Sequence, residues 1–177
     1  MPSTPYDVKG LLIGCIEDDN PVIFIDDRWL YNNLGEVPEE TYSIPLGKGI
    51  IRREGKDVTL VATSYMVTEA IKAALILEKD GTDVEIVDPR SIKPLDEVLL
   101  IESVKKTGRL VVADAGWKTC GIGAELTALV VEKAFKYLKA PVIRVSLPDA
   151  PAPASSVLEK VYYPRAKDII SAVRKLL

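Results

Sequence analysis

The sequence predicts an α/β fold, a three-layer α/β/α sandwich built on a mostly parallel sheet with one antiparallel edge strand. Short apolar segments without a polar face alternate with segments whose apolar residues recur at helical spacing. Strands of the first kind are buried on both faces, which requires helices on each side of the sheet. The length of 177 residues, 47% of them apolar, suits a single domain of roughly 150 residues or slightly more.

Residues 1–46 contain a helical segment, a short apolar segment and a long irregular stretch. The spacing of apolar residues predicts a helix over 6–18, with Ser3 or Thr4 as its N-cap. The four apolar residues 22–25 are few enough for a buried strand. Residues 26–46 keep neither a helical nor a strand period, so we expect an ordered loop that marks the boundary of the main domain.

From residue 47 onward the pattern is regular. Two strands are predicted at 49–53 and 57–63, joined as a hairpin through Glu54-Gly55-Lys56. A helix follows at 66–79, with Val67, Ala70, Ile71, Ala74 and Leu75 on its buried face. The later segments are a strand at 84–87, a helix at 95–106 ended by Gly108, a strand at 110–113, a helix at 124–138, a strand at 142–145 and a closing helix at 164–177.

Composition excludes several classes of function. The 23 basic and 26 acidic residues leave a net charge of −3, too balanced for a nucleic-acid-binding or polybasic membrane surface. No apolar run approaches the ~18 residues that cross a bilayer. The absence of histidine removes the commonest general base and the usual neutral metal ligand. The two distant cysteines, Cys15 and Cys120, suit a reducing compartment, so we expect a cytoplasmic protein.

Two turns are candidate ligand sites. Residues 88–96 begin where a strand leaves the sheet, the edge at which open α/β folds bind ligands, and Asp88 could pair with Arg90 there. A strand exit followed by a helix cap explains the same residues. Residues 116–125 form a glycine-bearing turn before a helix, and its N–H groups could hold an anion. Close packing of the helix on the sheet explains these glycines equally well, because the dinucleotide and phosphate-loop motifs are incomplete.

Two segments before residue 46 have unusual composition. The acidic residues 17–19, followed by Asn20, could supply oxygen ligands to a cation at a helix end, where carbonyl groups lack partners. A solvated helix end is the simpler interpretation. Residues 28–31 bring one arginine and two aromatic side chains together, a composition that is favoured at protein interfaces. Burial against the same chain would account for them as well.

Several longer segments form a distinctive set of motifs. They are PSTPYDVKGLL at 2–12, CIEDDNP at 15–21, GEVPEE at 35–40, IPLG at 44–47, EGKDVT at 54–59, DPR at 88–90, PLD at 94–96, SVKKTGRL at 103–110 and APV at 140–142. Together they resemble the β subunit of thiamine-diphosphate-dependent 2-oxo acid dehydrogenases, the enzymes of pyruvate, branched-chain 2-oxo acids and acetoin. The resemblance covers essentially the whole chain.

The resemblance implies a division of the chain. Residues 47–177 are similar to a transketolase C-terminal-type domain, and residues 1–46 to the helix, strand and linker of the preceding domain. In this family the preceding domain and the α subunit supply the groups that hold thiamine diphosphate and magnesium. The resemblance therefore implies that this chain contains neither catalytic nor cofactor-binding residues, and that it is inactive alone.

Further expectations follow from the same resemblance. The backbone carbonyls of Cys15, Asp18 and Asn20 would help to hold a structural monovalent cation, with other ligands from the preceding domain. The partners would be an α subunit and a second β subunit, and the region ending at Leu177 is a candidate docking surface for the acyltransferase core. Two alternatives stay open: part of a split transketolase or deoxyxylulose-phosphate-synthase-like enzyme, and an anion-binding regulatory module that uses the turn at 116–125.

Overall fold

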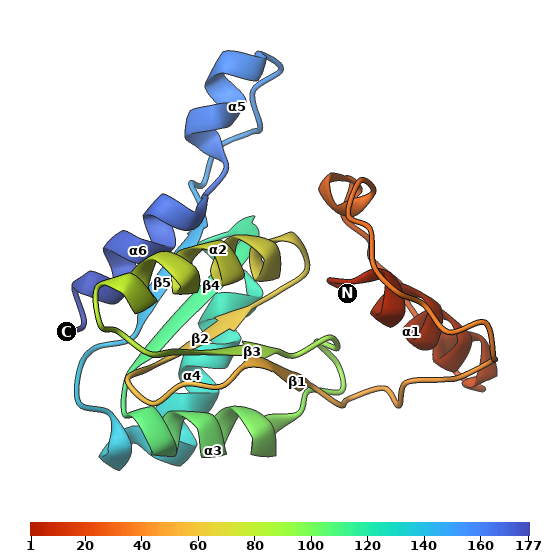
Figure 1. The fold of residues 1–177 in the computed structure, drawn as a ribbon, viewed down its shortest axis with the longest axis horizontal. Coiled ribbons are helices and arrows are strands. Elements are labelled where there is room, and N and C mark those ends of the chain that lie inside the picture. Colours follow the sequence, from red (N-terminus) through yellow and green to blue (C-terminus); the bar gives the residue numbers. More distant parts are fainter.

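A computed structural model describes residues 1–177 and contains a five-stranded mixed sheet in the order β1-β3-β2-β4-β5 (Figure 1). The strands are β1 (Ile50–Arg53), β2 (Val58–Ala62), β3 (Val84–Asp88), β4 (Leu110–Trp117) and β5 (Ile143–Leu147). The pairs β3–β2, β2–β4 and β4–β5 are parallel, whereas β1 lies antiparallel to β3 at one edge. The predicted parallel sheet with one antiparallel edge strand is therefore confirmed.

Helices cover both faces of this sheet. On one face lie α2 (Tyr65–Lys79) and α6 (Ala166–Arg174); on the other lie α3 (Glu97–Thr107) and α4 (Ile122–Ala134) (Figure 1). Successive residues of β2 supply the two cores, since Leu60 belongs to the first core and Val61 to the second. Because helices cover both faces, β2 has no solvent-facing polar side; Thr59, its one polar residue, is buried and hydrogen-bonded to Ser103 and Thr107. This arrangement confirms the predicted three-layer sandwich.

The connection between β1 and β2 is not the predicted hairpin. The two strands are not neighbours, because β2 lies between β3 and β4, and β1 pairs with β3 so that Ile50 faces Asp88. At Gly55 the chain passes so close to β3 that a Cβ atom would collide with the main chain of Val84 and Glu85. The glycine therefore serves a close crossing over the start of β3 and not a tight turn.

Local capping residues act as the sequence predicts. The Thr4 hydroxyl is the N-cap of α1 (Pro5–Glu17) and accepts the Asp7 amide at 3.2 Å. Helix α3 begins at Glu97, slightly later than expected, because the Asp96 carboxylate caps it. It ends at Gly108, whose φ of +75° places it in the left-handed region that glycine favours.

The helix α2 is rotated slightly from its predicted orientation. Ile71 and Leu75, both expected on its buried face, are 39% and 54% exposed. Ala73 and Leu77 occupy the core in their place, beside the correctly predicted Ala70. The apolar stripe is wide enough that spacing alone could not fix which edge of it faces the sheet.

Residues 22–25 do not form the predicted strand. They are extended, but no other strand lies alongside to accept their main-chain hydrogen bonds, and Ile23 is 87% exposed. The loop that follows is irregular, as expected, apart from one 3-10 turn, η1 (Arg28–Leu30).

The C-terminal third differs in its helix boundaries. The helix predicted at 124–138 ends at Ala134 and continues as the 3-10 turn η2 (Phe135–Tyr137). A short helix, α5 (Ser156–Tyr162), follows a segment rich in proline and alanine and was not predicted. The closing helix, predicted at 164–177, is shorter than expected, since α6 spans Ala166–Arg174, and Leu177 is 58% exposed.

Residues 1–46, here called the N-terminal arm, lie beside the sandwich and not within its layers. Figure 1 shows α1 and the following segment set apart from the helices that cover the sheet. The carboxyl ends of β2 and β3 meet this arm, since Ser64 donates to the Pro2 carbonyl and the Ser3 hydroxyl donates to Asp88. None of the helices combines the length and the apolar character required to span a bilayer.

Candidate functional site

Two buried acidic residues anchor the N-terminal arm to the end of β3. Asp7 of α1 and Asp88 of β3 are fully buried. The guanidinium of Arg52, from β1, donates from Nε and Nη2 to Asp88 Oδ2 at 3.0 and 2.9 Å, and it also pairs with Asp7. The Ser3 hydroxyl donates to the same Asp88 oxygen at 2.6 Å. Charged hydrogen bonds in a dry environment thus join the arm to the sheet.

Burial controls the electrostatics of this cluster. It raises the pKa of Asp88, because removing the carboxylate from water disfavours its charged form. The positive charge of Arg52 and the hydrogen bonds from Ser3 and Arg52 act in the opposite direction. Arg52 therefore offsets the cost of burying the Asp88 carboxylate.

The turn after β3 also holds the arm. Arg90 has a φ of +56°, and its main-chain N–H donates to Asp88 Oδ1 at 3.0 Å. Its guanidinium turns away and donates to the carbonyls of Lys48 and Gly49 at 2.9 and 3.2 Å, and it contacts Asp7 at 3.4 Å. The anticipated pairing of Asp88 with Arg90 therefore exists through the main chain. The turn joins three segments, which agrees with the simpler interpretation of residues 88–96.

A crevice lies outside the carboxyl ends of β2 and β4. Because the chain leaves β2 toward β3 on one side and reaches β4 on the other, this is the switch point at which doubly wound sheets bind ligands. Its volume is about 370 Å³, and its lining includes Asp26, Asp27 and Asp114 but no lysine or arginine. Asp114 is buried and accepts hydrogen bonds from the Thr63 hydroxyl and from the Gly116 amide.

The predicted anion-binding turn at 116–125 forms one wall of this crevice. Two of its main-chain donors serve carboxylates of the same chain: the Gly116 amide binds Asp114 at 3.0 Å and the Thr119 amide binds Asp149 at 3.1 Å. The hydrogen bonds from Thr119 lower the pKa of Asp149. Cys120, with a φ of +58°, is exposed at the tip of the turn. The surrounding negative charge disfavours an anion at this position.

The three predicted cation ligands lie on one cavity. Cys15, Asp18 and Asn20 line a space of about 470 Å³, whose opposite wall is the turn at 90–94. The Asp18 carboxylate accepts the main-chain and side-chain N–H groups of Asn20 at 2.8 and 2.9 Å, and these bonds lower its pKa. No main-chain or side-chain donor of the chain binds the carbonyl oxygens of the three residues. Those oxygens are thus available as ligands.

The aromatic residues at 28–31 have separate roles. Trp29 packs against the main domain, with its ring 5.0 Å from that of Tyr65 and 5.1 Å from that of Tyr163. The guanidinium carbon of Arg165 lies 3.9 Å from the Trp29 ring centre, a cation–π contact. Tyr31 instead remains 66% exposed. Packing against the same chain therefore accounts for part of the Trp29 surface, which stays 40% exposed, but not for Tyr31.

Little in the sequence indicates which residues pack against Trp29. Glu69 of α2 is buried, and its carboxylate accepts the Tyr65 hydroxyl at 2.9 Å and the Ala166 amide at 2.8 Å. Arg165 precedes α6, and burial lowers its pKa. An acid on the apolar side of a helix is the one available sign in the sequence, because unpaired buried carboxylates are rare.

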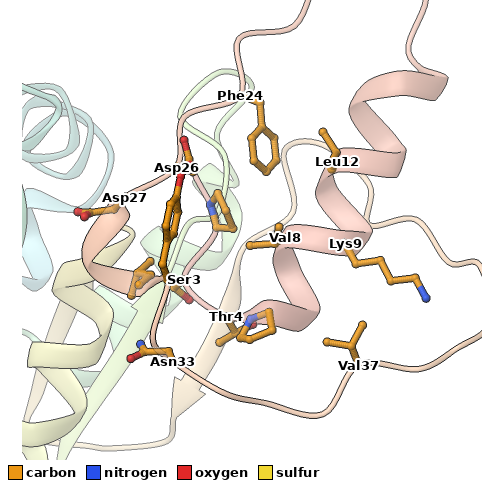
Figure 2. A pocket seen from close by; sticks show the side chains of 14 residues that line it. Ser3, Thr4, Val8, Lys9, Leu12, Phe24, Asp26, Asp27, Asn33 and Val37 are labelled. Atoms are coloured by element: carbon orange, nitrogen blue, oxygen red, sulfur yellow. Dashed lines mark hydrogen bonds between the residues drawn. The ribbon is translucent and has the colours of Figure 1, made fainter.

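A cavity of about 750 Å³ separates α1 from residues 24–37 (Figure 2). We call it the apolar groove. Figure 2 shows Val8 and Leu12 of α1 facing Phe24 across this space, with Val37 below them. The apolar side chains that line it are Val8, Leu12, Phe24, Leu30, Tyr31 and Val37. Its volume and lining suit an apolar occupant.

Comparison with known proteins places these features in context. Residues 47–169 match the family described as "Transketolase, C-terminal domain". The chain is 47% identical over 177 residues to the acetoin:2,6-dichlorophenolindophenol oxidoreductase subunit beta of Bacillus subtilis (strain 168), and covers 52% of that protein. It is 46% identical over 178 residues to the pyruvate dehydrogenase E1 component subunit beta of the same organism, and covers 54% of it. In both cases all of this chain is matched.

A solved structure is also similar. It is described as a split gene transketolase, inactive beta4 tetramer, and it superimposes on this chain with a TM-score of 0.69 at 34% identity. The match covers 76% of this chain and 44% of that one. The chain thus spans about half the length of the curated relatives it matches. The mixed sheet, the sandwich and the matched residues agree, and the chain belongs to the transketolase C-terminal domain family.

Proposed function

We propose that this chain is an assembly and subunit-interface domain of the decarboxylating component, the β subunit, of a thiamine-diphosphate-dependent 2-oxo acid dehydrogenase, and that it is not catalytic alone. The observation that carries this proposal is the apolar surface of the N-terminal arm. Ile16, Ile23 and Leu34 are 75%, 87% and 97% exposed, and none of them lines the apolar groove. Apolar surface of this kind on an ordered segment is typical of an interface.

The length of the relatives supports the same interpretation. Acetoin and pyruvate dehydrogenase β subunits are about twice as long as this chain, so they contain a further half that has no counterpart in it. Residues 22–25 have strand-like composition but no strand beside them. A polypeptide equivalent to that further half would cover the arm, and the boundary that we predict at residue 46 would separate it from the main domain.

The crevice at the switch point does not fit thiamine diphosphate. A diphosphate needs basic side chains or free N–H groups, and the crevice is lined by Asp26, Asp27 and Asp114 without any lysine or arginine. All three carboxylates accept hydrogen bonds from donors of this chain, so they are already engaged. We therefore expect thiamine diphosphate and magnesium to be held by other parts of the complete enzyme.

The chemistry of the chain agrees with a role in assembly. It has no histidine, and its buried carboxylates Asp7, Asp88 and Glu69 are occupied in joining segments of the fold. The partners we expect are an α subunit and a second β subunit, in the cytoplasm. The C-terminal region ending at Leu177, which is 58% exposed, is the candidate contact for the acyltransferase core.

A structural cation is a separate part of the proposal. The carbonyls of Cys15, Asp18 and Asn20 would supply some of the oxygen ligands of a monovalent ion, and the covering polypeptide would supply the rest. Three ligands are too few for a tight site in this chain alone. We expect the melting temperature of the chain to be the same in potassium chloride and in choline chloride, and to become potassium-dependent only in the reconstituted enzyme.

Reconstitution tests the proposed function. The purified chain, mixed with thiamine diphosphate, magnesium and pyruvate or a branched 2-oxo acid, should release no carbon dioxide and should give no heat of cofactor binding. Addition of an α subunit and the further half of an acetoin dehydrogenase β subunit should form a complex that elutes as one species. Turnover by the chain unaided, or failure to associate with either polypeptide, would show that the proposal is wrong.

The second candidate is a subunit of a split transketolase or deoxyxylulose-phosphate-synthase-like enzyme. The similarity to a split gene transketolase favours it, although the identity of 34% is lower than the 47% shared with the acetoin enzyme. Partner choice separates the two, because each enzyme class supplies a different second polypeptide for the complex. An anion-binding regulatory module is a third candidate. The negative charge of the crevice argues against it, and measured binding of phosphate at residues 116–125 would support it.

A further inference from the structure

The strand β5 forms an open edge of the sheet. It pairs with β4 on one side and has no strand on the other, and Figure 1 shows it beside α6. The irregularity in its pairing lies in β4, because Ala113 and Trp117 of β4 face Val145 and Leu147 of β5. A regular edge strand can accept a further strand, since one row of its main-chain groups lacks partners.

The pairing with β4 identifies the main-chain groups on the open edge. The Ala113 carbonyl accepts the Thr63 amide at 3.3 Å, so Ala113 turns toward β2 and its partner Val145 turns toward β4. Because alternate residues of a strand turn to opposite edges, Arg144 and Ser146 direct their main-chain N–H and C=O groups outward. No hydrogen bond from elsewhere in the chain reaches these outward groups.

A groove of about 570 Å³ follows this edge, between β5 and α6. We call it the edge groove. Every residue of β5 lines it, and α6 contributes the small side chains of Ser171 and Ala172. Small side chains on the facing helix leave room for the main chain of another polypeptide beside β5.

The edge groove carries more positive than negative charge. Lys118, Arg144 and Lys175 line it, and none of them forms an ion pair within the chain. The two acids of its lining, Asp149 and Asp168, already accept hydrogen bonds from donors of the chain. Unpaired cations beside free main-chain groups favour a partner segment that is acidic.

A second copy of the chain does not fit this edge. Two β5 edges side by side would bring Lys118, Arg144 and Lys175 of one copy close to the same residues of the other, and like charges at an interface are unfavourable. Pro141 and Pro148 flank β5, which is five residues long, so the edge can pair with only a short segment.

We propose that the edge of β5 binds a short, extended, acidic segment of another protein, which adds a strand to the sheet. The outward groups of Arg144 and Ser146 would pair with its main chain. Its side chains would alternate between the two faces. Acidic ones would meet the Arg144 side chain, which lies over Gly123 of α4, and small ones would lie toward Ser171 and Ala172. This inference goes beyond the proposed function, because the surface lies outside the N-terminal arm.

Isothermal titration calorimetry of the full chain with a capped octapeptide of alternating glutamate and valine tests the site. We expect binding that weakens as sodium chloride is raised from about 0.05 to about 0.5 M, because the cations of the edge groove are partly exposed. The control is a capped octapeptide of alternating lysine and valine, which should not bind. Equal binding of the two peptides would overturn the inference.

A proline variant tests the contribution of the main chain. Ser146→Pro removes an N–H that has no partner in the free chain, and proline is compatible with such a position on an edge strand. Binding of the acidic peptide should weaken more than about tenfold, because a hydrogen bond is lost and the peptide carbonyl stays unpaired. Ser146→Ala keeps the N–H and should bind normally. Circular dichroism of both variants checks the fold.

A charge-reversal variant tests the contribution of the cations without altering β5. Lys118→Glu/Lys175→Glu changes two exposed side chains and should weaken binding of the acidic peptide more than about tenfold. Lys56→Glu/Lys136→Glu makes the same change in net charge at exposed positions outside the edge groove, and should bind as the wild type does. Equal losses in the two variants would overturn the inference, since net charge alone would then explain binding.

Amide hydrogen exchange followed by nuclear magnetic resonance locates the bound peptide. In the free chain the amide of Val145 should exchange slowly, and those of Arg144 and Ser146 rapidly. The acidic peptide should slow exchange at Arg144 and Ser146. Absence of binding, or binding that leaves these two amides unchanged, would overturn the inference. The proposed assembly function is tested separately, by association of the chain with an α subunit and the further half of the β subunit.

Discussion

Arg52 is the residue on which the attachment of the N-terminal arm depends most. Its guanidinium is 15% exposed and lies between Asp7 and Asp88, both of which are completely buried. A buried ion pair contributes modestly as a unit, but the loss of one member leaves an uncompensated charge in a dry environment. Arg52 is the one arginine side chain that pairs with Asp88, and it shares Asp7 with Arg90, so its removal should have a larger effect than the loss of either acid.

We expect Arg52→Gln to lower the free energy of unfolding by about 3 kcal/mol at neutral pH. Urea unfolding followed by circular dichroism measures this change. Arg174→Gln is the matched control, because Arg174 pairs with Asp80 where both side chains are about half exposed, and it should cost less than about 1 kcal/mol. Equal losses in the two variants would show that the buried cluster has no special role.

The deficit of Arg52→Gln should depend on pH. Burial places the folded-state pKa of Asp88 above its ordinary value of 3.8, and Arg52 opposes that shift. The folded state therefore binds a proton at Asp88 more tightly than the unfolded state does. The free energy of unfolding consequently rises as pH falls through the folded-state pKa of Asp88. Without Arg52 this pKa rises further. The difference between variant and wild type should therefore shrink from pH 7 to about pH 5, and a constant difference would contradict this account.

The connection between β1 and β2 is the element for which local pattern and tertiary structure disagree. Two apolar segments separated by three residues with a glycine are typical of a hairpin. The register instead places β1 on the far side of β3, so the pairing depends on residues that are distant in sequence. What fixes the connection is the space at Gly55, where only the absence of a side chain allows the chain to cross β3.

Replacement of Gly55 tests this explanation. Gly55→Ala should lower the free energy of unfolding by about 2 kcal/mol or more, because the neighbouring atoms are main chain and cannot move aside. Differential scanning calorimetry measures the accompanying fall in melting temperature. Gly35→Ala is the control, since a Cβ atom there meets only ordinary contact with Pro5 at 3.4 Å. If Gly55→Ala melts at the wild-type temperature, the close approach to β3 does not explain why glycine is needed in this connection.

Elements with local determinants were predictable, and those with distant determinants were not. The Thr4 cap and the Gly108 stop follow from a few neighbouring residues, and the structure confirms them. Residues 22–25 have the composition of a strand but lack a neighbouring strand, which a sequence cannot reveal. The short helix α5 lies below the length at which periodicity is informative.

The candidate site shows the same limit. The turn at 88–96 was located from sequence. The cation ligands that the resemblance implies, Cys15, Asp18 and Asn20, line one cavity, and their role stays a prediction. The ion pairs of Arg52 and the contact of Arg165 with Trp29 connect residues that are far apart in the chain. Such pairs have no local signature, so only the folded arrangement identifies them.

At the scale of the whole molecule, a well-packed sandwich is attached to an arm whose outer surface is apolar. The sandwich has a complete core on each face of its sheet. The contacts that fix the arm include the Arg52 cluster and the Trp29 contact, yet Ile23 and Leu34 remain in solvent. Stability and association should therefore reside in different parts of the chain.

The double variant Ile23→Thr/Leu34→Ser should separate the two properties. Because both side chains are almost fully exposed, the free energy of unfolding should change by less than about 0.5 kcal/mol. Association with the further half of the β subunit should weaken more than about tenfold, as measured by isothermal titration calorimetry. Val131→Ser, on the outer surface of α4, should alter neither property. A large loss of stability in the double variant would mean that the arm packs on the main domain through these residues.

The Trp29 contact also determines when the arm can settle during synthesis. Trp29 is translated more than a hundred residues before Tyr163 and Arg165, against which it packs. The central strand β2 likewise cannot pair along both edges until β4 has been translated. The arm is thus translated before the residues that hold it in its final position. Until then the apolar surface of the arm is exposed, and chaperones can bind it. A partner polypeptide can also bind this surface before folding is complete.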